Sequence, residues 1–232
     1  MQSPKKVVSF RVIIQALFFV LVMPFLPLMI SGQWNWWEGW AYGILGFVSF
    51  VISRLLAAKH EPDLIAERAK FMQHEDAQAW DKKIIPLLGL VGIVTAVISG
   101  LDRLFNWTPI FDLWVSVLGL ILLVVGYTIS SYALIVNRFF SGMVRLQTDR
   151  GQHVISEGPY RWVRHPGYAG GLLAYLATPL LLNSIWLLIP ILLTVGLYVM
   201  RTSLEDRFLQ KNLEGYREYA KKVQYRLVPG IW

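Results

Sequence analysis

Residues 168–200 read YAGGLLAYLATPLLLNSIWLLIPILLTVGLYVM, and no charged side chain interrupts them. Asn183 divides the stretch into two apolar segments, Tyr168–Leu182 and Ser184–Met200. A helix needs about 20 apolar residues to cross the hydrocarbon core of a bilayer, and two segments with so short a link must turn back on each other. The stretch therefore predicts a tight helical hairpin in a membrane, with Pro179 and Pro190 inside it.

Four further apolar segments precede this hairpin. None contains a charged residue, and they are Val12–Ile30, Gly39–Ile52, Ile84–Gly100 and Trp114–Val136. Overall, 55% of the 232 residues are apolar and the mean hydropathy is +0.48. Charged residues make up 16%, against about 25% in a soluble domain. We therefore predict an all-α fold, a polytopic membrane helical bundle of about six spans, whose first span is kinked by Pro24 and Pro27.

Basic residues are distributed unevenly among the loops. The formal net charge is +7 and the pI is about 9.7. With both termini cytoplasmic, six spans leave only Arg103 on the opposite side of the membrane, as the positive-inside rule predicts. This topology explains the basicity without nucleic acid. We expect a single membrane domain over 1–232, with four spans in 1–136 and a catalytic loop, the hairpin and a cytoplasmic C-terminal helix in 137–232.

Composition disfavours several kinds of site. The chain has no cysteine, and its four histidines, His60, His74, His153 and His165, lie far apart, so we expect no metal site. No charged residue lies near the middle of a predicted span, which argues against a pump or channel. The loop at 54–83 mixes both signs of charge and is expected to form an amphipathic helix at the membrane interface.

The densest polar motif is GPYRWVRHPGYAGG, residues 158–171. Pro166 suits the first turn of a helix, and the free N–H groups of such a turn bind anions. Arg164 and His165 would add positive charge beside it. An alternative is a membrane-surface loop whose arginines set the topology and whose glycines pack helices. The motif also contains residues that leave room for a ligand or supply ring faces: Gly167, Gly170, Gly171, Tyr160 and Tyr168.

A second polar constellation lies in the tail, 201–232, on the same predicted side of the membrane as the loop 137–167. Its apolar residues, from Leu204 through Tyr216 to Val223, recur at helical spacing. Ser203 and Asp206 have the spacing of a capping box. Glu205 is left without a local structural role and could face the anion-binding helix end across the hairpin. An amino-acid zwitterion with a sulfonium group, such as S-adenosylmethionine, would pair with both charges and favour aromatic faces.

The two constellations together resemble the isoprenylcysteine carboxyl methyltransferase family, an integral membrane family. The first match is Gly158-Pro159-Tyr160-Arg161-x-Val163-Arg164-His165-Pro166-x-Tyr168-x-Gly170. The tail, from Glu205-Asp206 to Tyr225-Arg226-Leu227-x-Pro229-Gly230-x-Trp232, is similar to the bacterial branch, as are Asn137-Arg138-Phe139-Phe140-Ser141 and Arg145-Leu146-Gln147. The resemblance covers about 137–232, whereas the first half matches mainly in hydropathy.

The resemblance implies an S-adenosylmethionine-dependent methyltransferase. Its cofactor would be held by Tyr160, His165, Pro166, Tyr168 and Gly170, with Glu205 on the methionine ammonium group. Arg164 and Arg226 would act as catalytic residues that orient an anionic methyl acceptor, and Tyr216 and Tyr219 would line the acceptor pocket. Many relatives carry two glutamates where this chain has Glu205-Asp206, so the shorter Asp206 is not expected to reach the cofactor.

The same resemblance implies a multi-pass protein surrounded by membrane lipids, in a bacterial inner membrane. A lipophilic acceptor could enter sideways from the bilayer while the cofactor arrives from the cytosol. A carboxylate acceptor is already ionised at neutral pH, whereas an amine would need deprotonation. Two other classes stay open: a membrane NADPH-dependent reductase of sterol-like or fatty substrates, and a non-catalytic membrane protein.

Overall fold

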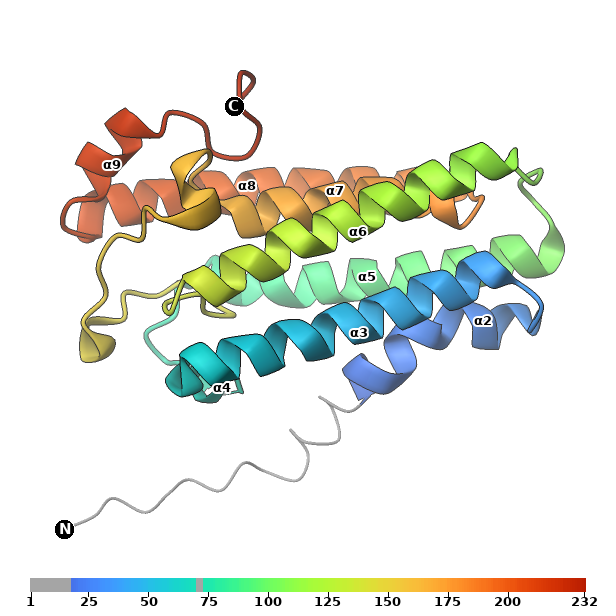
Figure 1. The fold of residues 1–232 in the computed structure, drawn as a ribbon, viewed down its shortest axis with the longest axis horizontal. Coiled ribbons are helices and arrows are strands. Elements are labelled where there is room, and N and C mark those ends of the chain that lie inside the picture. The colour runs from blue at the N-terminus through green and yellow to red at the C-terminus, as the bar shows by residue number, and fades with distance from the viewer. Residues whose placement is uncertain (1–17, 70–72) are drawn as a thin grey trace, which may run out of the picture.

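The computed structural model describes residues 18–69 and 73–232, which form helices and loops without any strand (Figure 1). In chain order the elements are η1 (Phe18–Val22), η2 (Met23–Phe25), α2 (Leu26–Ser31), α3 (Trp37–His60), α4 (Pro62–Ala69), α5 (Asp81–Phe105), α6 (Leu113–Val136), η4 (Thr148–Arg150), η5 (Gly158–Arg161), α7 (Pro166–Leu181), η6 (Ile185–Leu187), α8 (Leu188–Asn212) and α9 (Tyr216–Lys222).

Within the described residues, four helical segments are long and apolar enough to cross a membrane: α3, α5, α6 and the η6–α8 unit Ile185–Asn212. They contain the predicted second, third, fourth and sixth spans, and α3 and α5 extend beyond the predicted ends at both termini. The fifth span is α7, whose 16 residues give a helix of about 24 Å, shorter than the roughly 30 Å hydrocarbon core. The all-α membrane bundle is therefore confirmed, whereas the count of six spans stays a prediction.

The first predicted span, Val12–Ile30, lies partly outside the described residues. From Phe18 onward it changes from a π turn to a 3₁₀ turn that contains Pro24, and then to the short helix α2 with Pro27 in its first turn. Proline removes a backbone donor and clashes with the preceding turn. The predicted distortion at these two prolines is confirmed.

The helices of the second half pack most closely. α7 lies along α6 and also contacts α8, while α5 packs on α8 and α2, and α3 packs on α6 (Figure 1). Gly126 of α6 and Gly170 of α7 face each other, and a Cβ added at Gly170 would lie 2.5 Å from the Gly126 carbonyl oxygen. Small residues at such a crossing let two membrane helices approach backbone to backbone.

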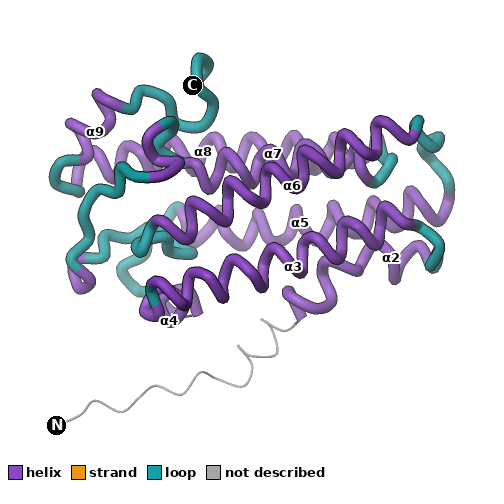
Figure 2. Tube along the Cα trace, viewed as in Figure 1, coloured by secondary structure: helices purple, strands orange, loops and turns teal. Residues whose placement is uncertain are grey.

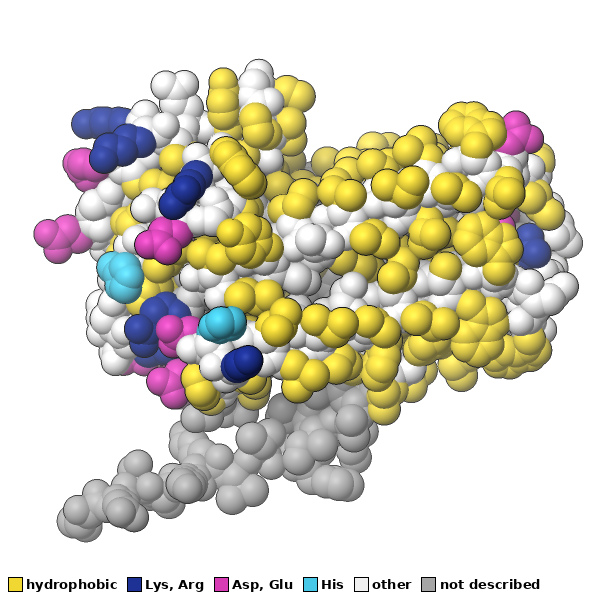
Figure 3. Space-filling model, viewed as in Figure 1, with side chains coloured by type: hydrophobic (Ala, Val, Ile, Leu, Met, Phe, Trp, Pro, Cys, Tyr) yellow, Lys and Arg dark blue, Asp and Glu magenta, His cyan; other side chains and the backbone are white. Residues whose placement is uncertain are grey.

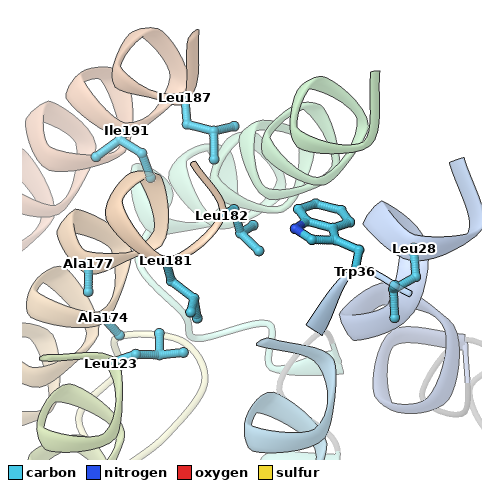
Figure 4. Packing of buried hydrophobic residues seen from close by; sticks show 9 residues of the cluster. All are labelled: Leu28, Trp36, Leu123, Ala174, Ala177, Leu181, Leu182, Leu187 and Ile191. Carbon is cyan, nitrogen blue, oxygen red and sulfur yellow. The ribbon is translucent and has the colours of Figure 1, made fainter. Parts of the chain in front are cut away.

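An apolar core joins the helices at the end of the bundle where α2 leads to α3, α5 to α6 and α7 to η6, which we call the far end. Figure 4 shows Leu28 of α2 and Leu182 beside Trp36, which is fully buried, while Leu123 of α6 and Ala174 of α7 lie together further along the core. The labelled core residues are Leu28, Trp36, Leu123, Ala174, Ala177, Leu181, Leu182, Leu187 and Ile191.

Asn183 makes the turn between α7 and η6 in the left-handed region, with φ of 54°. Its side-chain oxygen accepts a hydrogen bond from the Phe111 N–H at 2.8 Å, and its amide nitrogen donates to Glu38 at 3.2 Å and Ser116 at 3.0 Å. Asparagine tolerates this conformation better than most residues. The predicted hairpin with its turn at Asn183 is thus confirmed.

The opposite end, which we call the polar end, carries the long loops. Figure 2 shows the extended connection between α6 and α7 at this end, beside α4 and α9. In Figure 3, the charged side chains of the visible face gather mostly there, while apolar side chains cover the length of the helices. The loop 137–165 and the segment after Met200 therefore lie on one side of the bundle, as the charge distribution predicted.

Two local predictions are wrong. Ser203 and Asp206 do not cap a new helix, because α8 continues without interruption to Asn212. The apolar stripe from Leu204 to Val223 is interrupted at Gly215, which separates α8 from α9. The φ angle of Gly215 is 77°, in the left-handed region that favours glycine. The basic end of α9, with Lys221 and Lys222 in its last turn, is as predicted.

The predicted interfacial helix at 54–83 also needs correction. Residues up to His60 belong to α3, and within the described residues only the short α4 follows before α5. α4 buries Leu64 against Ala57 of α3 and Leu134 of α6. Packing on the protein itself, and not only an amphipathic pattern, thus holds α4 in place.

Candidate active site

A cavity at the polar end encloses about 790 Å³ of space, part of it at its open mouth. Its walls come from the loop after α6, from η5, from the first turn of α7, from the end of α8 and from α9. The loop 137–167 and the tail 201–232 thus line the same space. The predicted site residues that line it are Tyr160, Arg164, His165, Tyr168, Glu205, Tyr216 and Tyr219.

The loop that forms one wall is held by an ion pair between the two halves of the chain. Asp81, at the start of α5, is fully buried and accepts a hydrogen bond from the Val144 N–H at 2.7 Å. Arg201 of α8 donates to both Asp81 carboxylate oxygens at 2.7 and 3.0 Å, and to the Gly142 carbonyl at 3.1 Å. A bidentate pair of this kind fixes direction as well as distance.

A second anchor for the same loop is Arg145. Its guanidinium contacts Glu67 of α4 at 2.9 Å, Asp76 at 3.1 Å and Asp149 at 2.9 Å. The hydrogen bond from Arg145 lowers the pKa of the Asp149 carboxyl below its usual value. Acidic residues of the segment 54–83 therefore hold the cavity wall in place through ion pairs with Arg145 and Arg201, a role that the sequence did not predict.

The third wall begins at the motif Arg164-His165-Pro166. Pro166 is the first residue of α7, as predicted, and His165 occupies the N-cap position. The N–H groups of Arg164 and His165 donate to the carbonyls of Tyr225 and Arg226, both at 2.9 Å. The C-terminal segment is thus paired through its backbone with the residues that begin α7.

Asp206 lies at the centre of this wall, with a fully buried carboxylate. It accepts hydrogen bonds from Arg164 at 2.7 and 3.1 Å, from Arg226 at 3.0 Å and from Tyr216 at 3.2 Å. The remaining Arg164 nitrogen donates to the Val223 and Gln224 carbonyls at 2.7 and 2.8 Å. Both predicted acceptor-binding arginines are therefore committed to Asp206, and the donors of Arg164 are engaged on every side.

Glu205 lies next to Asp206 in the sequence but faces a different group. Its carboxylate accepts a hydrogen bond from the Tyr168 hydroxyl at 2.5 Å. The Tyr168 ring lies parallel to the His165 ring at 5.7 Å between centroids, and the Arg201 guanidinium carbon is 4.9 Å from the Tyr168 centroid. A carboxylate, two parallel rings and a helix N-terminus thus meet at one cavity.

The other predicted tyrosines form the buried back of the cavity. The Tyr219 hydroxyl donates to the Tyr160 carbonyl at 2.7 Å, and the Tyr160 hydroxyl accepts from Asn137 at 3.0 Å. Burial raises the pKa of Tyr160, Tyr216 and Tyr219, so all three hydroxyls stay protonated near neutral pH. These groups are suited to donate hydrogen bonds and not to act as bases.

Three predicted residues do not line the cavity: Pro166, Gly170 and Arg226. Gly170 faces α6, where a Cβ would also lie 2.6 Å from the Ser130 nitrogen, so its observed role is helix packing and not ligand contact. Gly167 does line the cavity, and it lies against the ring of Phe140. A Cβ added at Gly167 would lie 2.5 Å from the nearest carbon of that ring.

Sequence reasoning missed Arg201, Asp81 and Arg145 as parts of the site. Asp81 was taken as part of a mixed-charge loop, Arg201 as a topology charge, and Arg145 as a topology charge and a residue of the family match, because their partners are far away in sequence. An apolar part of the cavity wall was also missed. It consists of Val154, Leu209 and Leu213, which pack around Tyr216, Tyr219 and Val223.

Known proteins show a matching pattern over the same region. The profile of the family described as "Phospholipid methyltransferase" matches residues 114–215. Protein-S-isoprenylcysteine O-methyltransferase A of Arabidopsis thaliana is 30% identical over 142 residues, which cover 59% of this chain and 68% of that protein. A probable protein-S-isoprenylcysteine O-methyltransferase of Oryza sativa subsp. indica is 29% identical over 132 residues, or 55% and 69% of the two chains.

A more distant match is the mouse Delta(14)-sterol reductase, which is 32% identical over 95 residues but is covered over only 23% of its length. The fold, the cavity and these relatives define a multi-pass membrane methyltransferase. The chain belongs to the isoprenylcysteine carboxyl methyltransferase family. The relatives named here are eukaryotic, so the bacterial branch and the bacterial inner membrane stay predictions.

Proposed function

We propose that this protein transfers a methyl group from S-adenosylmethionine to the carboxylate of a lipophilic acceptor, at a site on the cytosolic side of the membrane. The observation that carries the proposal is the meeting of Glu205, the parallel rings of His165 and Tyr168 and the N-terminus of α7 at one cavity. The proposed topology places both termini on the cytosolic side, in line with the charge at the polar end.

The residues present fit the charges of this cofactor. Glu205 is placed to bind an ammonium group, and the N-terminus of α7 is suited to a carboxylate. Aromatic faces attract a sulfonium cation, and His165 and Tyr168 supply two. The apolar wall at Val154, Leu209 and Leu213 is suited to a flat base.

When bound, S-adenosylmethionine supplies an electrophilic methyl group, whose transfer forms a C–O bond, breaks the C–S bond and moves no proton if the acceptor is a carboxylate. The protein therefore needs no general base, in agreement with the raised pKa values of Tyr160, Tyr216 and Tyr219. Its residues would align the two reactants and exclude water. In this proposal Asp206, Arg164 and Arg226 hold His165 and the C-terminal segment in place, while Tyr216 and Tyr219 form the back of the cavity.

The acceptor class follows from the membrane location and from the relatives. A lipophilic chain would stay in the bilayer while its polar end reaches the cavity, so that the acceptor enters from the side. The names of the plant relatives point to carboxylates of S-isoprenylated cysteine.

Calorimetric titration of the detergent-purified protein tests the cofactor first. S-adenosylmethionine and S-adenosylhomocysteine should bind, and NADPH should not. Glu205→Gln should weaken S-adenosylmethionine binding about tenfold or more, because a hydrogen bond to a charged group is worth about 1.5–3 kcal/mol. Glu214→Gln, at an exposed position beyond α8, is the matched control. Binding of NADPH alone would replace the proposal with a reductase, and equal affinity in both glutamine variants would refute the role of Glu205.

A further inference from the structure

Several arginines of the polar end are withdrawn at least partly from water, and they differ in whether a carboxylate lies beside them. Arg145, Arg164, Arg201 and Arg226 each form an ion pair with one or more carboxylates at 3.1 Å or less. Arg68, in the last turn of α4, is half-buried and has no carboxylate within ion-pair distance among the described residues. The stretches outside the description, 1–17 and 70–72, contain neither Asp nor Glu. Withdrawing a guanidinium from water costs free energy when no anion compensates for the lost hydration.

Arg54 of α3 also has no carboxylate partner in the described chain, but its surroundings differ. Its guanidinium lies over the ring of Phe50 on its own helix, at 4.1 Å, and donates to Ser53 at 2.9 Å. Arg68 instead donates to the Phe140 carbonyl at 2.9 Å and lies 5.3 Å from the centroid of the Phe140 ring. Arg68 is thus bound to a residue of the cavity wall.

Phe140 separates Arg68 from the first turn of α7. Its ring lies against Gly167, and both residues line the cavity. Burial lowers the pKa of Arg68 to about 10, an effect that Tyr168 opposes and Arg201 reinforces, so both cavity residues lie within its electrostatic reach. Arg68 therefore stays cationic at neutral pH and has no carboxylate counter-ion in the part of the chain that the structure describes.

A row of aromatic rings leads from the same point toward the middle of the bundle. The Tyr198 ring of α8 is 5.5 Å from Tyr168 and 6.0 Å from Tyr175, which lies two turns further along α7. Tyr168, Tyr175 and Tyr198 are each partly exposed or border the cavity. Rings in this arrangement offer an apolar surface that starts beside the carboxylate of Glu205 and continues along membrane helices.

We propose that Arg68 binds the carboxylate of the methyl acceptor, whose apolar chain lies along Tyr198 and Tyr175. This inference rests on the proposed function, because it names the anion-binding residue of that site. It assigns the task to Arg68, which has no carboxylate partner in the described structure, in place of Arg164, whose donors Asp206 and two backbone carbonyls already occupy. It also places the determinant of acceptor charge in the N-terminal half of the chain.

The test compares acceptor binding with cofactor binding in three variants: Arg68→Gln, Arg68→Lys and the control Arg207→Gln. Arg207 is exposed at the same end of the bundle and forms no ion pair in the described structure. The probes are N-acetyl-S-farnesylcysteine and its primary amide, titrated calorimetrically without cofactor and then used in a methylation assay. The wild-type protein should prefer the acid over the amide by about tenfold or more, since a charged hydrogen bond is lost with the amide.

In Arg68→Gln the preference for the acid should disappear and the KM of the acid should rise about tenfold or more, with S-adenosylmethionine affinity unchanged. Arg68→Lys should keep part of the preference, and Arg207→Gln all of it. An undiminished preference in Arg68→Gln would overturn the inference. So would an equal loss of S-adenosylmethionine affinity in both Arg68 variants, which would show that Arg68 only holds the loop at Phe140. If the wild-type protein binds the acid through Arg68 but binds no S-adenosylmethionine, the proposed function fails and the anion site stands.

Discussion

Replacing Asp206 with asparagine should release the C-terminal segment from the start of α7. The substitution keeps the size of the side chain but removes its charge. It leaves Arg164 buried without a counter-ion and weakens the contact to Arg226. The backbone pairing of Arg164 and His165 with Tyr225 and Arg226 depends on these contacts.

The structure sets the size of the effect. The side chains of Asp206 and Arg164 are 0% and 5% exposed, and breaking a buried pair of this kind costs about 3–5 kcal/mol. Arg226 is 28% exposed, so its share is smaller, at most about 1 kcal/mol. Because asparagine retains one acceptor oxygen, we expect about 3 kcal/mol, or roughly a hundredfold increase in the open population.

Hydrogen exchange followed by mass spectrometry measures this opening directly. Peptides that contain the amides of Arg164 and His165 should exchange about a hundredfold faster in Asp206→Asn than in the wild-type protein. Asp149→Asn is the control, because that carboxylate also pairs with an arginine but is 61% exposed. Its effect should stay below about tenfold, as for surface pairs. If the two variants exchange equally at Arg164 and His165, Asp206 does not hold the segment.

Three further outcomes are expected. Gly170→Leu should abolish or severely weaken folding in a thermal-shift assay, since its side chain would clash with the α6 backbone. Gly171→Ala is the control, because no atom lies within 4 Å of the added Cβ, and it should leave the melting temperature unchanged or slightly higher. Because the pKa of Asp149 is lowered in the folded protein, its pair with Arg145 stabilises the loop at neutral pH, and this contribution should fade as the pH falls below the ordinary Asp value of about 4. The thermal shifts of wild type and Asp149→Asn should therefore converge in acid, and a constant difference would contradict this reasoning. Arg145→Met should expose the loop 137–153 to limited proteolysis while α6 and α7 stay protected; unchanged cleavage would show that other contacts hold the loop.

The fold was predictable because it depends on local signals. The charge-free stretch, the short link at Asn183 and the position of Pro166 each act within one or two helical turns, and the structure confirms all three. The helix α6, Leu113–Val136, differs from its predicted start by one residue. The close packing of Gly170 on Gly126 was among the stated alternatives for the glycines.

The cavity walls were less predictable because their contacts are long-range. Ser203 and Asp206 have the spacing of a capping box, but the observed partners of Asp206 are Arg164 and Arg226, which lie outside its own helix. Asp81 and Arg201 are 120 residues apart, and no local pattern indicates such a pair. The break at Gly215 was missed because the apolar spacing continues across it.

The dependence of the cavity wall on Asp81 and Glu67 limits how the molecule can be recombined. The family profile starts at residue 114, yet the carboxylates that hold Val144 and Arg145 lie before it. A chimera that joins the C-terminal half of this chain to the first spans of a relative would inherit Arg201 without Asp81, and Arg145 with Asp149 but without Glu67 and Asp76. Functional exchange of halves within this family therefore requires compatible acidic residues at positions 67 and 81, and co-transfer of α4 and the start of α5 is the smallest transplant that preserves the wall.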